Sequence, residues 1–238
     1  MALAIVSKNA RPQEMAALEA AGFSVLPCPP SPFLPEPIAD HPDAILSILG
    51  RRIYCYEEYY KENVEFFSAL KALCPSATVI PLPDAPKHEY PGDCAYNLLS
   101  VSRHVFFNPK GLAPSLAAAC EKCGYQIHHV RQGYAACTVR TLGNRHAITA
   151  DAGMARALEE AGINVLLIRE GGISLPPYAS GFIGGASGFF KDTAYFFGSL
   201  PSHPCGKEIG AFIRAASFSA KSLSDEPLRD FGGILFIE

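Results

Sequence analysis

The cysteine pair Cys120 and Cys123 has the spacing of a metal or redox site, and His128 and His129 follow a few residues downstream. These four residues make only half of a recognisable zinc-binding pattern. The pair also lies at the predicted end of a helix, before Gly124, where the helix dipole raises the pKa of a thiol. The sequence therefore favours a packing role for both cysteines, and it predicts neither a metal site nor a cofactor.

A glycine-rich segment at residues 181–188 superficially resembles a phosphate-binding loop. Such a loop is followed by a helix, whereas the next residues here, FFKDTAYFF, are typical of a strand. Glycines within a strand indicate a bulge or a close approach of the backbone, either to a neighbouring strand or to a ligand. Packing is the favoured interpretation, and Ser187 is the residue of this segment that is a candidate to face a ligand.

Eight cysteines are scattered at irregular spacings through apolar segments of the 238-residue chain. The N-terminal sequence lacks the basic residues and the apolar length of a secretion signal, and no stretch reaches about 18 uninterrupted apolar residues. We therefore expect a soluble, cytoplasmic protein whose thiols are free and mostly buried. Cys205 stands at the predicted start of a helix, where the dipole favours a thiolate.

Charge and composition exclude several classes of protein. The chain has 20 Lys and Arg against 23 Asp and Glu, a net charge of -3, so no global positive field attracts nucleic acid. Hydrophobic residues make up 49% and charged residues 18%, which excludes a disordered chain. The 20 glycines and 20 prolines follow no collagen period. We expect a globular, turn-rich protein that binds neither nucleic acid nor membrane, and the oligomeric state is left open.

Similar groups of predicted elements recur five times along the chain. Each group has two strands joined by a tight turn, then a helix, then a third strand. The groups begin at Asp43, Asp93, Tyr134, Phe182 and Phe231, which are 50, 41, 48 and 49 residues apart. The fifth group is divided, because its first strand is at the C-terminus and its other elements are at the N-terminus.

This order of elements predicts an α/β fold built as a five-unit, pseudo-symmetric α/β propeller. Adjacent strand pairs favour hairpins beside each helix over a doubly wound sheet, and repetition of this kind is typical of propellers. We expect one domain, residues 1–238, whose ring is closed by the N- and C-terminal segments. The proline-rich segment 27–42 then joins the fifth unit to the first. Asp151 is expected to cap a helix that ends at Gly162.

The openings of the units carry a resemblance to a known family. They read HPDAIL, YPGDCAYN, QGYAACTV, YASGFIGGASG and SDEPLRDFGG. With the fivefold order of elements, these segments resemble an uncharacterised bacterial branch of the guanidino-modifying-enzyme fold, also called the penteins. The resemblance covers most of the chain, and its most specific parts are QGYAACTV, the glycine-rich segment and HPD.

Pentein enzymes include arginine and agmatine deiminases, dimethylarginine hydrolases and amidinotransferases. The resemblance implies a site at one end of the central channel with a Cys nucleophile, a His and carboxylates. In that chemistry a thiolate attacks the guanidinium carbon, the His passes a proton to the leaving amine, and carboxylates hold the cation. The families carry the cysteine in the last strand, in a pattern like G-G-x-H-C-x-T, where this chain has Leu235 and Phe236.

The nearest match to the nucleophile motif lies instead in the third unit, at Cys137. By this resemblance Cys137 is the nucleophile and His41 the acid or base, and Cys205 is a second, weaker candidate nucleophile. The residues expected to bind the substrate are Asp43 and Asp93, which would hold the cation, Asn97, which would orient it, and Tyr134 and Ser187. A cysteine in an apolar strand is more often a small core residue, His41 can be a loop residue before Pro42, and Asp93 can serve only an Asx turn.

Two functions follow from these residues. The first is an enzyme that acts on a guanidino or amidine-bearing small molecule, with a cationic substrate as its partner. The alternative is a non-catalytic pentein module that binds a small molecule or another partner, which the loss of Cys from the last strand favours.

Overall fold

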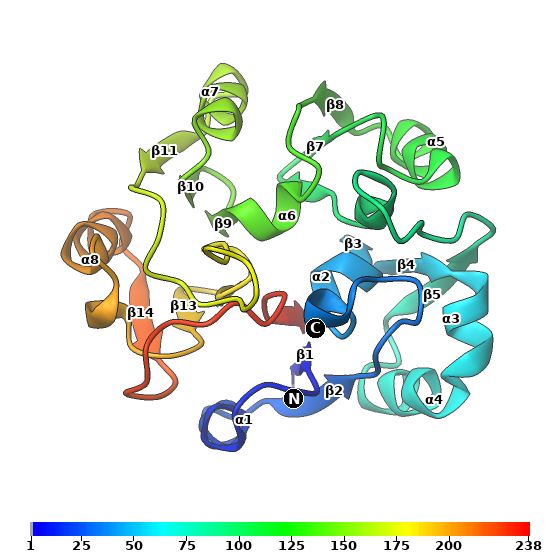
Figure 1. The fold of residues 1–238 in the computed structure, drawn as a ribbon, viewed down its shortest axis with the longest axis horizontal. Coiled ribbons are helices and arrows are strands. Elements are labelled where there is room, and N and C mark those ends of the chain that lie inside the picture. The colour runs from blue at the N-terminus through cyan, green and yellow to red at the C-terminus, as the bar shows by residue number, and fades with distance from the viewer. Residues whose placement is uncertain (1) are drawn as a thin grey trace.

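Five sheets of three strands each surround a central axis in the computed structural model, which describes residues 2–238 (Figure 1). In every sheet the middle strand pairs antiparallel with the first strand and parallel with the third. This is the pairing that a hairpin followed by a helical crossover produces. The predicted five-unit α/β propeller is therefore confirmed.

Four units are continuous in the chain, and each contains its elements in the predicted order. The first contains β3 (Ser47–Leu49), β4 (Arg52–Tyr56), α3 (Glu57–Glu62), α4 (Val64–Leu73) and β5 (Thr78–Leu82). The second contains β6 (Leu99–Val101), β7 (His104–Phe107), α5 (Pro114–Lys122) and β8 (Gln126–His129). The third contains β9 (Val139–Leu142), β10 (His146–Thr149), α7 (Ala152–Glu160) and β11 (Asn164–Leu167). The fourth contains β12 (Ser187–Phe190), β13 (Thr193–Phe196), α8 (Gly206–Ala215) and β14 (Ser219–Ser222).

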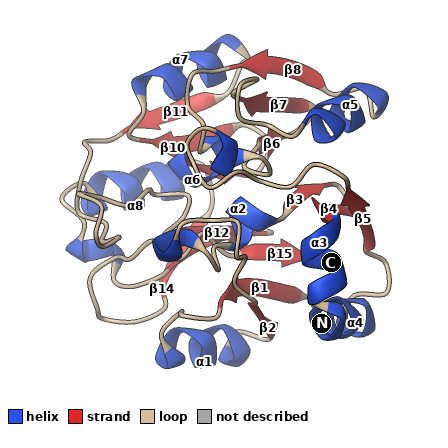
Figure 2. Cartoon of the chain, turned by 45° about the vertical axis from the view of Figure 1, so that its right-hand side comes forward, coloured by secondary structure: helices blue, strands red, loops and turns tan. Residues whose placement is uncertain are grey.

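The fifth unit is assembled from both ends of the chain. Its elements are β15 (Leu235–Ile237), β1 (Leu3–Ser7), α1 (Pro12–Ala20) and β2 (Ser24–Cys28). Strands β1 and β15 lie side by side (Figure 2), with Leu3 opposite Ile237 and Ile5 opposite Leu235. The terminal segments thus close the ring, as the sequence predicted.

The apolar core is distributed between neighbouring units. Four buried clusters each join side chains from at least two neighbouring units. The long helices lie on the outside of the ring, where they cover the sheets (Figure 1). No helix within residues 2–238 has both the length and the apolar character needed to span a bilayer.

Short helical turns precede the first strand of three units, and here the sequence-based assignment of strands was wrong. The turns are α2 (Pro42–Ile45), the 3₁₀ turn Gly92–Cys94 and α6 (Ala135–Thr138). Two further 3₁₀ turns are Glu36–Ile38 and Leu200–Ser202. In α6 the N–H of Thr138 donates to the carbonyl of Tyr134 (3.0 Å). A four-residue apolar segment has too few residues for its periodicity to separate a strand from a helical turn.

The glycine-rich segment also begins as turns rather than as a strand, since β12 starts only at Ser187. Its glycines permit close packing. A Cβ at Gly185 would collide with the carboxylate of Asp230, and a Cβ at Gly184 would collide with carbonyls of α6. The packing interpretation of these glycines therefore accounts for both positions.

Helix α7 begins at the cap that the sequence predicts. Asp151 Oδ1 accepts a hydrogen bond from the N–H of Met154 (2.8 Å), and Gly162 follows the helix with a φ of +80°. We expect Asp151→Ala to lower the free energy of unfolding by about 1 kcal/mol, because the N–H groups of the first turn lose their acceptor. Urea denaturation checks this value. Asp151→Ser should recover most of the loss, and equal stability of the Ala variant and the wild type would contradict the capping role.

Candidate active site

A cavity of about 300 Å³, called the axial cavity below, lies where the openings of the five units meet. Each unit supplies at least one lining side chain. These are His41 from the first unit, Asp93 from the second, Tyr134 and Cys137 from the third, Phe182 from the fourth and Asp230 from the fifth. Of the seven side chains that the sequence singles out as catalytic or substrate-binding, four therefore line one cavity. Asp43, Asn97 and Ser187 do not line it.

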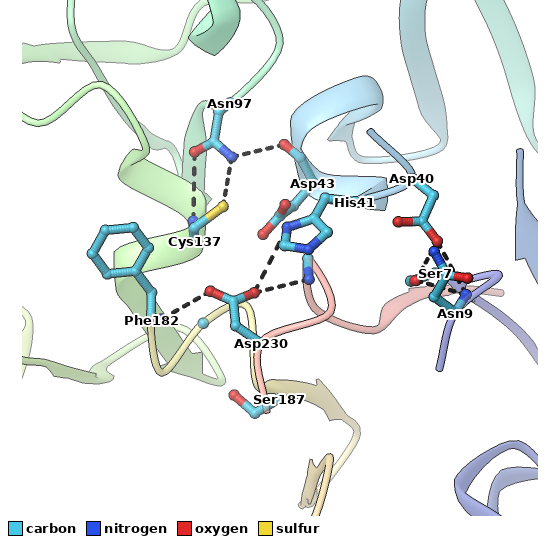
Figure 3. A network of polar contacts seen from close by, with 12 residues as sticks. Ser7, Asn9, Asp40, His41, Asp43, Asn97, Cys137, Phe182, Ser187 and Asp230 are labelled. Carbon is cyan, nitrogen blue, oxygen red and sulfur yellow. Dashed lines mark hydrogen bonds and ion pairs between the residues drawn. The ribbon is translucent and has the colours of Figure 1, made fainter. Parts of the chain in front are cut away.

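Asn97 is a buried connector between the first and third units. Its Nδ2 donates to the carbonyl of Asp43 (2.9 Å) and to Sγ of Cys137 (3.0 Å) (Figure 3). Its Oδ1 accepts from the N–H of Ala136 (2.8 Å). The amide thus fixes α6 against α2 and points one N–H at the sulfur. This contact orients the thiol, so Asn97 acts on Cys137 rather than on the contents of the cavity.

Asp230 is the main polar residue of the site that sequence analysis missed. Its carboxylate accepts hydrogen bonds from the N–H groups of Phe182 (2.8 Å) and Gly232 (2.9 Å). Nδ1 of His41 lies 3.7 Å from Oδ1 of the same carboxylate (Figure 3). The signal was present, because Asp230 lies in the opening of the fifth unit just as Asp43 and Asp93 lie in the openings of theirs.

Asp43 lies beside the cavity and is fully buried among other charged groups. Within the described part of the chain, its Oδ1 has no hydrogen-bond partner. Burial raises the pKa of Asp43 to about 6; His41 and Arg140 oppose this shift, and the negative charge of Asp230 adds to it. The charged form of Asp43 is thus less favourable in the folded protein than in water, and a nearby cation favours it.

The raised pKa of Asp43 makes stability depend on pH. Between the ordinary pKa of 3.8 and about 6, the folded state holds a proton that the unfolded state has lost. The free energy of unfolding therefore falls as pH rises through this window. We expect the fall due to Asp43 to total about 3 kcal/mol. Urea denaturation from pH 4 to 7 should show this slope in the wild type and a reduced slope in Asp43→Asn, whereas parallel profiles would contradict the assignment.

Cys137 presents a buried thiol to the cavity. Burial raises its pKa well above the ordinary value, the carboxylates of Asp43 and Asp230 add to this shift, and the hydrogen bond from Asn97 opposes it. The protein environment therefore favours the thiol form of Cys137 over the thiolate. Contrary to the sequence-based assignment, Cys137 lies in the helical turn α6 and not in a strand.

Asp93 and Tyr134 together form another polar part of the cavity lining. The hydroxyl of Tyr134 donates to Oδ2 of Asp93 (2.5 Å), and the thiol of Cys94 donates to Oδ1 (3.3 Å). The rings of Tyr90 and Tyr134 lie 6.0 Å apart. Asp93 is thus held in place by Cys94 and by Tyr134, which also lines the cavity.

Ser187 lies away from the lining residues (Figure 3), in a second polar group around Arg140. Its Oγ donates to the carbonyl of Ile183 (2.5 Å) and accepts from Nε of Arg140 (2.9 Å). Nη2 of Arg140 donates to the carbonyls of Gly184 (2.6 Å) and Ser187 (2.7 Å). Burial lowers the pKa of Arg140 to about 10, although Asp43 opposes this shift. Arg140 therefore partly balances the buried negative charge of Asp43.

The remaining candidate cysteines lie outside the axial cavity. Cys205 is buried at the start of α8, where its N–H donates to Nδ1 of His203 (3.0 Å). Cys120 is buried in α5, and Cys123 follows that helix. Nε2 of His128 lies 2.9 Å from Nδ1 of His104, which is hydrogen-bonding distance. Within residues 2–238, no three or more His, Cys, Asp or Glu side chains are grouped so that they could hold a metal ion.

Comparison with solved structures places the fold among guanidino-modifying enzymes. A dimethylarginine dimethylaminohydrolase is similar with a TM-score of 0.57 and 13% identity, over 94% of this chain and 92% of that chain. The inosamine-phosphate amidinotransferase of Streptomyces griseus has a TM-score of 0.56 and 16% identity, over 92% and 74%. An amidinotransferase of the saxitoxin biosynthetic pathway, from Microseira wollei, has a TM-score of 0.55 and 13% identity, over 93% and 88%.

These likenesses confirm the pentein fold that the unit openings suggest. No curated protein sequence matches the chain. A family model described as a family of unknown function, DUF6873, matches residues 5–235. The chain therefore belongs to the DUF6873 family of unknown function, and it has the pentein fold.

Proposed function

We propose that this protein binds a small guanidinium or amidinium compound in the axial cavity and breaks one of its C–N bonds, with Cys137 as nucleophile and His41 as acid and base. One observation carries the proposal. Cys137, His41 and the carboxylates of Asp93 and Asp230, which come from four different units, line the same cavity. A nucleophile, a proton carrier and groups that hold a cation are the components that this chemistry requires.

Binding and activation of the thiol are coupled in this proposal. A guanidinium or amidinium group is planar and donates parallel N–H bonds, so carboxylates bind it in bidentate fashion. Its positive charge offsets the carboxylates that keep Cys137 protonated. The thiolate therefore forms when the ligand is bound, and the empty site is protected from adventitious reaction with electrophiles.

The proposed reaction has two stages. His41 accepts the thiol proton, and Sγ of Cys137 attacks the central carbon of the cation, forming a C–S bond. His41 then donates the proton to the departing nitrogen as the C–N bond breaks, which leaves a covalent adduct on the cysteine. Water attacks the carbon of that adduct and gives a proton to His41, and the C–S bond breaks to release the oxygenated product and the thiolate. The proton returns from His41 to Cys137.

Ammonia, amine and urea release from a panel of guanidines and amidines tests the proposal. The wild type should form product with at least one compound, and Cys137→Ala should form none while it still binds that compound. Thermal stabilisation by the compound, which reports binding to the folded state, establishes that the variant binds. Product formation at the wild-type rate by Cys137→Ala would contradict the proposal.

A binding module without turnover is the second candidate, and the last strand favours it. Leu235 and Phe236 stand where related enzymes are expected to carry the nucleophile. The ring of Phe236 packs against Phe23 (centroids 4.7 Å apart) and Tyr195 (5.5 Å). Phe236 therefore contributes to apolar packing in this protein. Thermal stabilisation by guanidines without product in any assay would favour the module over the enzyme.

We place the protein in the cytoplasm, where thiols remain reduced. Its eight cysteines are free in the described structure, and seven of them are buried. This arrangement supports a reducing compartment, and it leaves Cys137 available for chemistry.

A further inference from the structure

The axial cavity has two carboxylates in its lining and no lysine or arginine among its described residues. Among the described residues that line it, the acidic and basic side chains are Asp93, Asp230 and His41. A ligand carboxylate would therefore meet two carboxylates of the protein and no permanent cation. In a cavity shielded from water, such a like-charge contact is strongly unfavourable.

Arg140 does not provide a cation for a ligand in the cavity. It lies outside the lining of the cavity, and its guanidinium donates to Oγ of Ser187 and to the carbonyls of Gly184 and Ser187. Its charge is also partly matched by Asp43, whose negative charge raises the pKa of Arg140 against the effect of burial. The guanidinium is thus held by the protein interior and is not presented to a ligand.

Two tyrosines form the rim of the cavity. Tyr90 and Tyr178 both line it, yet they are 57% and 47% exposed, whereas the other polar lining residues are buried or partly buried. Tyr90 packs against the backbone of Gly133, where an added Cβ would lie 2.7 Å from Cε2 of the ring. Tyr178 is held in a turn in which its N–H donates to the carbonyl of Leu175 (2.8 Å). The ring of Tyr90 and the backbone of Tyr178 are therefore held at the mouth of the cavity.

Apart from Ser180, the remainder of the wall is mainly apolar and aromatic. It includes Ile38, Leu175 and Phe182, and the ring of Phe182 lies 6.3 Å from that of Tyr134. Aromatic faces attract cations, and they also pack against apolar groups. A ligand whose cation reaches Asp93 and Asp230 thus leaves its substituent between the rim tyrosines.

We propose that the axial cavity selects guanidines and amidines that carry one positive charge and an apolar or aromatic N-substituent, and that it rejects guanidino compounds bearing a carboxylate. This inference rests on the proposed function, since it assigns the substrate class of the same cavity. The carboxylate-bearing compounds include arginine itself. The substituent contacts Tyr90 and Tyr178, which act as specificity-determining residues.

Calorimetric titration with a matched pair of ligands tests the rejection of carboxylates. Butylguanidine and 4-guanidinobutanoate have similar length, and the second ends in a carboxylate where the first ends in a methyl group. At pH 7 we expect butylguanidine to bind the full-length protein at least ~10-fold more tightly. Equal or tighter binding of 4-guanidinobutanoate would overturn this inference while the proposed function stands. Binding of neither compound would overturn both.

Titration with benzylguanidine tests the rim. We expect it to bind the wild type more tightly than butylguanidine does. In the double variant Tyr90→Leu, Tyr178→Leu we expect the ratio of the two Kd values, butylguanidine over benzylguanidine, to fall by about 3- to 10-fold. Tyr60→Leu is the matched control, because Tyr60 is 38% exposed on the outer helix α3. An unchanged preference in the double variant, or an equal change in the control, would overturn the role of the rim.

Discussion

Replacing Cys137 with serine is expected to lower kcat for the best guanidine substrate by at least ~10³-fold, with Kd for that substrate changed by less than about threefold. A hydroxyl in this environment is a much weaker nucleophile than a thiolate, and no second thiol lines the axial cavity within the described residues. Steady-state assays give kcat, single-turnover measurement of product formation gives the rate of the chemical steps without the influence of product dissociation, and calorimetry gives Kd.

Cys205→Ser provides the matched control for this prediction. Cys205 is as buried as Cys137 and was the second candidate nucleophile, but it lies at the start of α8, outside the axial cavity. It should leave kcat within about twofold of the wild type. If the Cys205 variant lost activity while the Cys137 variant retained it, the assignment of the nucleophile would be wrong.

Asp230→Ala should lower the free energy of unfolding by about 3 kcal/mol and abolish measurable guanidine binding. The substitution leaves the N–H groups of Phe182 and Gly232 without their charged acceptor in the interior. It also removes one of the two carboxylates that line the axial cavity and the partner of His41. Urea denaturation measures the first effect and calorimetric titration the second.

Two further variants separate the roles of this carboxylate. Asp230→Asn keeps one carbonyl oxygen but supplies no acceptor for the second N–H, so it should show an intermediate loss of stability and the same loss of cation binding. Asp225→Ala alters an exposed carboxylate of the same loop and should change stability by no more than about 0.5 kcal/mol. Retention of guanidine affinity in a folded Asp230→Ala variant would refute the role of Asp230 in binding.

The fold was predictable because its signal is repeated. Each unit shows two short strands around a turn and one helix, and five weak copies in the same order support each other. The division of the fifth unit between the termini was also readable, since the strand pattern at residues 235–237 lacks the helix that would follow it. Local structure at the unit openings was not predictable, because α2 and α6 are single turns whose conformation depends on contacts such as the hydrogen bond from Asn97 to Asp43.

Four side chains of the axial cavity, His41, Asp93, Tyr134 and Cys137, were predictable for the same reason. Pseudo-symmetry places the openings of all units at the axis, so residues 94 positions apart, Asp43 and Cys137, were expected near each other. Arg140 lies on β9 and its guanidinium is enclosed by the glycine-rich turns of the next unit, which no local pattern reveals. Tyr90 and Tyr178 lie in long connections, and their positions at the rim depend on how separate loops pack.

Labelling with 2-chloroacetamidine, followed by peptide mass spectrometry, tests most directly the claim that Cys137 attacks a cation held in the axial cavity. The thiolate displaces chloride and forms a stable C–S bond, and the amidinium group supplies the charge that the cavity binds. Neutral 2-chloroacetamide, of nearly the same size, is the control reagent. We expect 2-chloroacetamidine to modify Cys137 before the other seven cysteines, at a rate at least ~10-fold above that of 2-chloroacetamide, and butylguanidine to slow this modification. Modification of other cysteines while Cys137 stays unmodified, or equal rates for the two reagents at Cys137, would contradict the claim.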